Sequence, residues 1–241
     1  MPHFYIPPEN IHDGKFFIEG SEARHISVVL RLKAGALINF FDGKGMAYAG
    51  KIISISKGRI EGVLAAGVLS DAGTAKIALY TAIAKGERFD WLIEKSCELG
   101  VNELIPVIAE RSVTKEAGGS KLARWQRIAE ASSKQSGRAD IMKISGITRF
   151  SDALDSSDKS ALSVIAWEEE SKTTLNSVLR SNVSFKSVSI FIGPEGGFTH
   201  HEIEASKRIG IIPVSLGTNI LRVETAGIAA VVIALNCSNE K

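Results

Sequence analysis

The sequence Phe191-Ile-Gly-Pro-Glu-Gly-Gly-Phe198 continues a short, apolar and β-branched segment, 187–192. A segment of that kind predicts a buried strand. The glycines that follow allow a sharp turn, and Pro194 stiffens it. Thr199, with Glu202 three residues later, matches a capping box and predicts that a helix begins there. Strand, glycine turn and helix in this order are typical of a ligand loop at the carboxyl edge of an α/β sheet.

The same order returns in Leu216-Gly-Thr-Asn-Ile-Leu-Arg-Val-Glu-Thr-Ala226. Residues 211–215 predict a strand, Gly217 a turn, and a helix is expected from about Glu224. Two such loops in succession predict two walls of one pocket. Neither loop is a P-loop or a dinucleotide fingerprint, since the required lysine and glycine spacings are missing. Taken alone, either loop could simply join a strand to a helix in an ordinary α/β fold.

Together, the two glycine loops resemble those of the RsmE-type 16S rRNA uracil-N3 methyltransferases, members of the SPOUT superfamily. The resemblance extends over nearly the whole chain. It departs from the family pattern at His3, at Asn219 and at 141–143, where the family often has arginine, a more basic residue and proline. Further matching segments are Phe41–Gly45, Lys85–Val101, Arg124–Ile128, Ala131–Arg138 and His25–Leu32.

The resemblance implies an α/β fold: a SPOUT-type parallel-sheet domain with a carboxy-terminal trefoil knot, preceded by a small PUA-like β-barrel. It also implies a cytoplasmic homodimer that uses S-adenosylmethionine and acts on 16S rRNA of the small ribosomal subunit, without a metal or a membrane. A helix over 224–236 rich in small residues is compatible with close packing in such a dimer. The expected cofactor-binding residues are Ala166, Gly193, Pro194, Gly196, Gly197, Leu216, Gly217, Ile220, Leu221, Thr225 and Ala226.

Methyl transfer to N3 of uracil requires that the imide proton leaves, so a base or a cation near the carbonyl oxygens is needed. Arg222 is the candidate cation. Glu195 and Glu224 are the candidate bases, and Glu195 could also favour a positive sulfonium. Glu224 has an alternative explanation, because a carboxylate at a helix start is stabilised by the helix dipole. N3 lies on the pairing edge, so the target uridine must be unpaired or flipped out.

Length and composition agree with one small and one medium domain. The chain has 241 residues, of which 44% are hydrophobic, enough for a sizeable core. No apolar run approaches the roughly 20 residues of a membrane span. Cys97 and Cys237 predict free buried thiols, and the five histidines lack metal-ligand spacing.

Residues 1–70 predict the barrel, with strands near 16–18, 36–41, 48–55 and 59–64. Between the first two strands, 21–33 predicts one short helix opened by Ser21. The basic residues Arg24, Arg31 and Lys33 near this helix are candidate contacts for RNA phosphates; an ordinary solvated face is the alternative.

The polar turn 70–74 predicts a domain boundary, and residues 74–241 predict the methyltransferase domain. Strands over 76–84 and 104–109 and a helix over 91–99, capped by Asp90, predict a parallel sheet covered on both faces. Pro106 would place its strand at an edge, or itself at the strand's start.

The chain is most basic over 111–149, with nine Lys/Arg against three Asp/Glu. A helix over 121–137, if continued, would bring four basic side chains within about 80° of arc, which suits a phosphate backbone. A solubilising face is the alternative explanation. The four residues are Arg124, Arg127, Lys134 and Arg138.

Two other functions fit parts of these patterns. One is a non-catalytic RNA-binding protein in which the barrel is the binding module. The other is a SPOUT methyltransferase that acts on tRNA or on a ribose 2′-hydroxyl. Neither accounts for the full-length pattern as well as N3 methylation of a 16S rRNA uridine.

Overall fold

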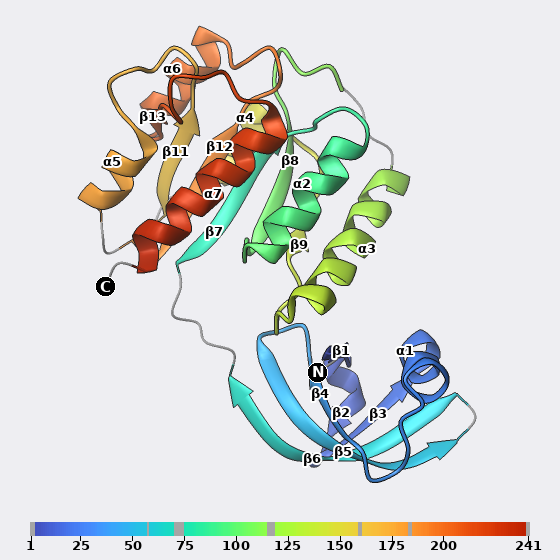
Figure 1. Ribbon diagram of the computed structural model, residues 1–241. Coiled ribbons are helices and arrows are strands. Elements are labelled where there is room, and N and C mark those ends of the chain that lie inside the picture. Colours follow the sequence, from blue (N-terminus) through green and yellow to red (C-terminus); the bar gives the residue numbers. More distant parts are fainter. Residues whose placement is uncertain are drawn as a thin grey trace. The chain divides into compact units, whose positions relative to one another are not determined.

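The computed structural model describes residues 3–56, 58–69, 75–114, 119–158, 161–182 and 185–239. It divides into two compact units (Figure 1). One contains Met1–Ala72 with Ala131–Ile141, and the other Gly73–Glu130 with Met142–Lys241. The predicted boundary at 70–74 lies outside the described residues and stays a prediction. The grouping of 131–141 with the first unit was not anticipated.

The first unit contains a curved six-stranded sheet in the order β1-β4-β5-β6-β3-β2. Neighbouring strands are antiparallel except β1 and β4, which are parallel. Within the described residues, β1 and β2 form the two ends of this path, so hydrogen bonds do not close the expected barrel. The strands are β1 (His3–Tyr5), β2 (Ile11–His12), β3 (Lys15–Glu19), β4 (Leu37–Phe41), β5 (Met46–Ser56) and β6 (Arg59–Leu69).

Aromatic rings contribute to the apolar core of this unit. Phe16 and Phe40 pack with ring centroids 4.7 Å apart. An added Cβ would lie 2.5 Å from the Phe16 ring at Gly50 and 2.2 Å from it at Gly62. Only glycine therefore leaves room for this ring. Register shifts in β5 near Gly50 bend the strand around the core.

The helical segment of the first unit differs from the prediction. A short α1 (Gly20–Arg24) is followed by a π-helix over His25–Val29 instead of one regular helix. The N-cap is Glu19, and it makes no side-chain capping hydrogen bond, so the expected cap at Ser21 is wrong. Arg31 then adopts a positive φ of 54°, which ends the helical path.

The second unit is built on a parallel sheet, as predicted. Its main order is β10-β8-β7-β12-β11-β13, with β9 paired to β8. Each pairing is parallel. The strands are β7 (Lys76–Ala82), β8 (Glu103–Ile108), β9 (Lys143–Ile144), β10 (Thr148–Arg149), β11 (Leu162–Ala166), β12 (Ser187–Ile192) and β13 (Ile212–Val214).

Helices cover both faces of this sheet, also as predicted. On one face, α2 (Glu87–Glu98) and α7 (Val223–Asn239) lie side by side (Figure 1). The same apolar core includes α5 (Leu175–Ser181) and residues of α3 (Gly119–Ser136) up to Ala129. On the other face, α4 (Phe150–Ser156) and α6 (His200–Arg208) share a second core with Tyr80, Ile165 and Phe191.

Two local expectations fail in this unit. Asp90 does not cap α2: it lies inside the helix, whose N-cap is Gly86. Pro106 lies in the middle of β8, an interior strand that pairs with β7 along one side. On its other side β8 pairs with β9 at Glu103–Leu104 and with β10 at Val107–Ile108. Pro106 lies opposite Thr81 of β7, but on the other side it falls between the residues paired with β9 and those paired with β10, where no partner requires its N–H.

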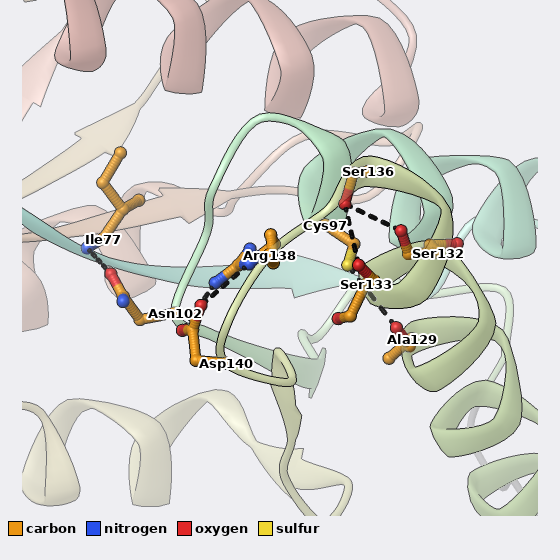
Figure 2. Close-up of polar contacts among 9 residues, drawn as sticks. All are labelled: Ile77, Cys97, Asn102, Ala129, Ser132, Ser133, Ser136, Arg138 and Asp140. Carbon is orange, nitrogen blue, oxygen red and sulfur yellow. Dashed lines mark hydrogen bonds and ion pairs between the residues drawn. The ribbon is translucent and has the colours of Figure 1, made fainter. Parts of the chain in front are cut away.

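Side chains add polar contacts around the sheet (Figure 2). The Asn102 side-chain oxygen accepts from the Ile77 backbone N–H at 2.9 Å, and the Asn102 N–H donates to the Ile77 carbonyl at 3.0 Å. These bonds fix the start of β7. The Cys97 thiol donates to the Ala129 carbonyl at 3.5 Å and joins α2 to α3. Cys97 and Cys237 are both free and buried, as predicted.

Candidate active site

A pocket of about 240 Å³ lies at the carboxyl edge of the parallel sheet, where three segments converge. They are 166–168 after β11, 192–197 after β12, and 215–223 after β13. The central strand β11 pairs with β12 on one side and β13 on the other. Because parallel strands end at the same edge, the three following loops meet there.

The predicted cofactor residues gather in this pocket with one exception. Thr225 is exposed and lies outside the lining. The predicted residues that line the pocket are Ala166, Gly193, Pro194, Gly196, Gly197, Leu216, Gly217, Ile220, Leu221 and Ala226.

The first glycine loop is held by its own backbone and by a buried ring. The Gly197 N–H donates to the Pro194 carbonyl at 2.9 Å. Gly197 has a φ of 68°, a conformation that favours glycine. Phe198 is buried and packs against Phe150 with ring centroids 4.9 Å apart. Beyond it, Thr199 and Glu202 form the predicted capping box at the start of α6. The loop is therefore anchored at both ends.

The second loop is exposed along its middle and anchored at its ends. Ser215 donates its N–H to the Thr173 carbonyl at 2.8 Å, and its hydroxyl accepts from the Gly217 N–H at 3.3 Å. The Ala226 N–H donates to the Arg222 carbonyl at 2.8 Å, which begins α7. Ile220 is 89% exposed although it lines the pocket. It therefore forms part of the rim.

The segment after β11 is stabilised by Glu170. Its carboxylate accepts from the backbone N–H groups of Thr173 at 2.9 Å and Lys172 at 2.8 Å. Those backbone donors, Thr173 first, lower the pKa of Glu170 below its usual value. Because Thr173 also accepts from Ser215, this turn links the β11 loop to the β13 loop.

The charged side chains of the pocket lining are acidic. Glu168 and Glu195 line it, and no lysine, arginine or histidine does so among the described residues. An added Cβ on Gly197 would lie 1.8 Å from the Glu168 Oε1 atom, so this carboxylate is seated against the glycine. At this strand end the sequence predicted only Ala166 as a pocket residue, so Glu168 was missed. Its position two residues after Ala166 was the available signal.

The three candidate catalytic residues are not brought together. Glu195 lines the pocket and is exposed. Arg222 is exposed and lies outside the lining, although its neighbours Leu221 and Val223 belong to it. Glu224 also lies outside the lining: its side chain is only 12% exposed, and one oxygen lies 3.9 Å from Nε of Arg88.

The candidate RNA-binding residues differ in exposure and in the ion pairs that they form. In the first unit, Arg24, Arg31 and Lys33 are exposed. In the second, Arg127 is exposed, and the exposed Arg124 forms an ion pair with Asp90.

Lys134 and Arg138 are engaged within the first unit. Lys134 Nζ lies 2.6 Å from a Glu22 oxygen. Arg138 pairs with Asp140 through two hydrogen bonds and is only 10% exposed (Figure 2). Because α3 ends at Ser136, Arg138 does not continue the helix face. The prediction of one four-residue basic stripe is therefore wrong.

Among the described residues, the His, Cys, Asp and Glu side chains form no group of three or more suited to a metal ion. Within the same ranges, no helix has the length and apolar character needed to cross a membrane.

Known proteins resemble the chain along most of its length. Residues 72–235 match the family described as RNA methyltransferase domain, and residues 18–65 match RNA methyltransferase PUA domain. The chain is 30% identical to ribosomal RNA small subunit methyltransferase E of Bacillus subtilis, over 89% of this chain and 87% of that protein.

Solved structures agree. The small subunit methyltransferase E of Neisseria gonorrhoeae, determined with bound S-adenosylmethionine, has a TM-score of 0.82 at 31% identity and covers 96% of this chain and 95% of its own. A probable rRNA methyltransferase of Porphyromonas gingivalis has a TM-score of 0.84 at 29% identity, with 98% of this chain and 99% of its own covered. The pocket at the strand ends thus lies in a chain that belongs to the ribosomal RNA small subunit methyltransferase E family.

Proposed function

We propose that this protein uses S-adenosylmethionine to methylate N3 of a specific uridine in the 16S RNA of the small ribosomal subunit. Membership of the methyltransferase E family supports the reaction class and the RNA. The cofactor of the Neisseria gonorrhoeae relative supports the donor. The observation in this chain that carries the proposal is the acidic, glycine-walled pocket at three adjacent strand ends.

The pocket suits the proposed cofactor in shape and charge. Leu216, Leu221 and Ala226 give the pocket an apolar part, which suits an adenine ring. Glycines in both loops leave backbone N–H and C=O groups accessible for specific hydrogen bonds. The carboxylates of Glu168 and Glu195 suit a ligand with a positive sulfonium. Thr225 lies outside the lining, and we assign it no cofactor contact.

When bound, S-adenosylmethionine supplies an electrophilic methyl group; the protein must orient the uracil and accept its N3 proton. Both carboxylates of the pocket are exposed, but Glu168 is seated against Gly197, so we assign the proton to Glu195. Arg222, next to the rim, is positioned to stabilise negative charge on the uracil oxygens or to bind the adjacent phosphate. Glu224, paired with Arg88, is assigned a structural role.

RNA binding is assigned to the exposed basic residues of each unit. Arg24, Arg31 and Lys33 would bind phosphates from the first unit, whose match to the PUA family supports this role. Arg124 and Arg127 on α3 would do so from the second. Lys134 and Arg138 already have carboxylate partners, so their part would be to hold the 131–141 segment.

We further propose two domains, 1–70 and 74–241, a trefoil knot in the second, a homodimer and a cytoplasmic location. Close packing of loops 193–199 and 215–222 in one pocket is compatible with a knot. The small residues of α7 do not themselves support the dimer: Gly227 packs on Leu92 of α2 in the same chain, where an added Cβ would lie 3.0 Å from Leu92 Cδ1. Trp91 on α2 and Val232 on α7 are exposed apolar side chains on adjacent helices and are available to a second copy. An active monomer in light scattering at working concentration would contradict the dimer.

Mass spectrometry of small-subunit rRNA nucleosides tests the function. RNA from cells lacking this protein should have lost one N3-methyluridine, and the purified protein with S-adenosylmethionine should restore it. Methylation of tRNA or of a ribose 2′-hydroxyl instead would identify a different methyltransferase. Cofactor-independent RNA binding with no methylated nucleoside would identify a non-catalytic binding protein.

A further inference from the structure

The two carboxylates of the pocket are held differently. Glu168 follows β11 directly, and its Oε1 atom occupies the space that a side chain at Gly197 would need, 1.8 Å from an ideal Cβ. Glu195 lies within the first glycine loop instead, although both glutamates are exposed. The Glu168 carboxylate is therefore seated on the pocket wall, between the loops that follow β11 and β12.

Within the described residues, the Glu168 carboxylate has no hydrogen-bond or ion-pair partner, and no basic side chain lines the pocket with it. An unpaired negative charge at a ligand site lowers the free energy of a cationic ligand and raises that of an anionic one. Its effect on an uncharged group is small.

On the basis of the proposed function, we propose that Glu168 makes the pocket select the cationic methyl donor over its product. S-adenosylmethionine carries a sulfonium, whereas the sulfur of S-adenosylhomocysteine is a neutral thioether, so the net charge falls by one on methyl transfer. The rest of the two molecules is the same. A carboxylate directed at the sulfur end stabilises the donor more than the product, and it favours product release after each turnover.

The neighbouring Glu169 provides a matched control. It has the same side chain, is exposed, and lies outside the pocket lining. One of its oxygens lies 3.4 Å from Nε2 of His200. Glu169→Gln therefore removes the same charge one residue away without removing a carboxylate from the pocket.

Isothermal calorimetry with S-adenosylmethionine and S-adenosylhomocysteine tests this role without measuring turnover. Glu168→Gln preserves the side-chain volume and should weaken donor binding about tenfold, as expected for one charge pair at a partly solvated site, while product binding changes less than about twofold. Glu169→Gln should leave the ratio of the two affinities near that of the wild type, and Glu195→Gln should change it less than Glu168→Gln does. A cationic analogue, with an ammonium-bearing carbon in place of the sulfonium, should follow the donor.

Salt provides a second test that needs no variant. In the wild-type protein, raising the ionic strength should reduce the preference for donor over product, because it screens the Glu168 charge. Equal losses of donor and product affinity in Glu168→Gln would show that Glu168 binds a part common to both and would overturn the proposal. An unchanged ratio in Glu168→Gln, or a ratio that responds more strongly to Glu195→Gln, would also overturn it. If wild-type protein binds neither molecule, the proposed function itself fails.

Discussion

Arg111 donates a hydrogen bond from Nη1 to the carbonyl oxygen of Gly196, 3.1 Å away. Arg111 lies beyond the end of β8, whereas Gly196 lies in the loop after β12, and β7 separates these strands in the sheet. An added Cβ on Gly196 would lie 3.2 Å from the Arg111 Cβ atom. A side chain from a non-adjacent strand end therefore supports one wall of the pocket from outside.

Replacing Arg111 should loosen that wall without unfolding the protein. Arg111→Ala removes a charge-assisted hydrogen bond, which at an exposed position is worth on the order of 1 kcal/mol. We expect the affinity for S-adenosylmethionine to fall about fivefold in calorimetry. Arg208→Ala, an exposed arginine at the end of α6, is the control and should leave the affinity unchanged. Equal affinities for both variants would show that Gly196 does not depend on this contact.

The capping box gives a prediction on stability. The Thr199 hydroxyl accepts from the Glu202 N–H at 3.2 Å, and the Glu202 carboxylate accepts from the Thr199 N–H at 2.8 Å. Thr199→Ala should lower the free energy of unfolding by about 1 kcal/mol in urea denaturation. Thr199→Ser keeps the hydroxyl oxygen, so its free energy of unfolding should fall much less. A serine variant as unstable as the alanine variant would mean that the methyl group, not the hydroxyl, carries the effect.

The lowered pKa of Glu103 predicts that its contribution to the stability of the protein depends on pH. Burial raises the pKa of this carboxyl, but hydrogen bonds from Lys143 and Ser145 outweigh burial and leave the pKa below its usual value. A carboxyl with a depressed folded-state pKa contributes stability above its unfolded-state pKa, and that stability is lost as the pH falls through the folded-state value. Glu103→Gln should therefore be less stable than wild type at pH 7, with a difference that shrinks below about pH 4. Urea denaturation at both pH values measures it. A constant difference would assign the effect to packing.

Short-range patterns made much of the second unit predictable. The strand at 187–192, the capping box at Thr199 and the alternation of strands and helices depend on neighbouring residues or on simple periodicity. The pocket walls followed because parallel strands end at one edge. These features need little knowledge of distant contacts.

The errors have tertiary causes. Asp90 is a residue type that commonly caps helices, but α2 begins before it. The Asp90 carboxylate instead pairs with Arg124 on another helix. The π-helix at 25–29 cannot be read from apolar spacing, because a segment of one turn is too short to distinguish i→i+5 from i→i+4 bonding. The angular spacing of a continued helix would place Arg138 on the basic stripe, but Gly137 adopts a φ of 73° and ends the helix before it. The contact between Glu168 and Gly197 joins two different loops, so patterns among neighbouring residues could not predict it.

Glu195 and Glu224 are the two candidate bases, and replacing each should have a different effect on the rate of methyl transfer. Glu195 lines the pocket, whereas Glu224 is mostly buried beside Arg88. Glu195→Gln should lower the single-turnover rate of methyl transfer about a hundredfold, the effect of removing a general base. Glu224→Gln should change that rate only a few-fold, since it leaves the pocket lining unaltered. Both rates are measured with small-subunit RNA and saturating S-adenosylmethionine. If Glu224→Gln has the larger effect, Glu224 is the base and its pairing with Arg88 must break in the RNA complex.

Arg222 lies between two residues that line the pocket, yet it does not line the pocket itself. Its side chain is exposed, and within the described part of the chain its guanidinium has no hydrogen-bond or ion-pair partner. Its backbone carbonyl accepts the first hydrogen bond of α7, from Ala226 at 2.8 Å. The main chain is thus fixed by the helix start while the charged group remains available to a ligand outside the cofactor pocket.

We therefore expect Arg222 to act on the uridine or its phosphate and not on the cofactor. Arg222→Ala should leave S-adenosylmethionine affinity within a few-fold in calorimetry, while single-turnover methylation falls about a hundredfold, the effect of removing one charge-stabilising donor. Arg222→Lys should restore only part of the rate, because lysine keeps the charge but loses the planar fork of donors. The backbone bond to Ala226 is retained in both variants, so neither should lose stability. If cofactor affinity fell in parallel with the rate, Arg222 would belong to the cofactor site, and its guanidinium would have to turn inward on binding.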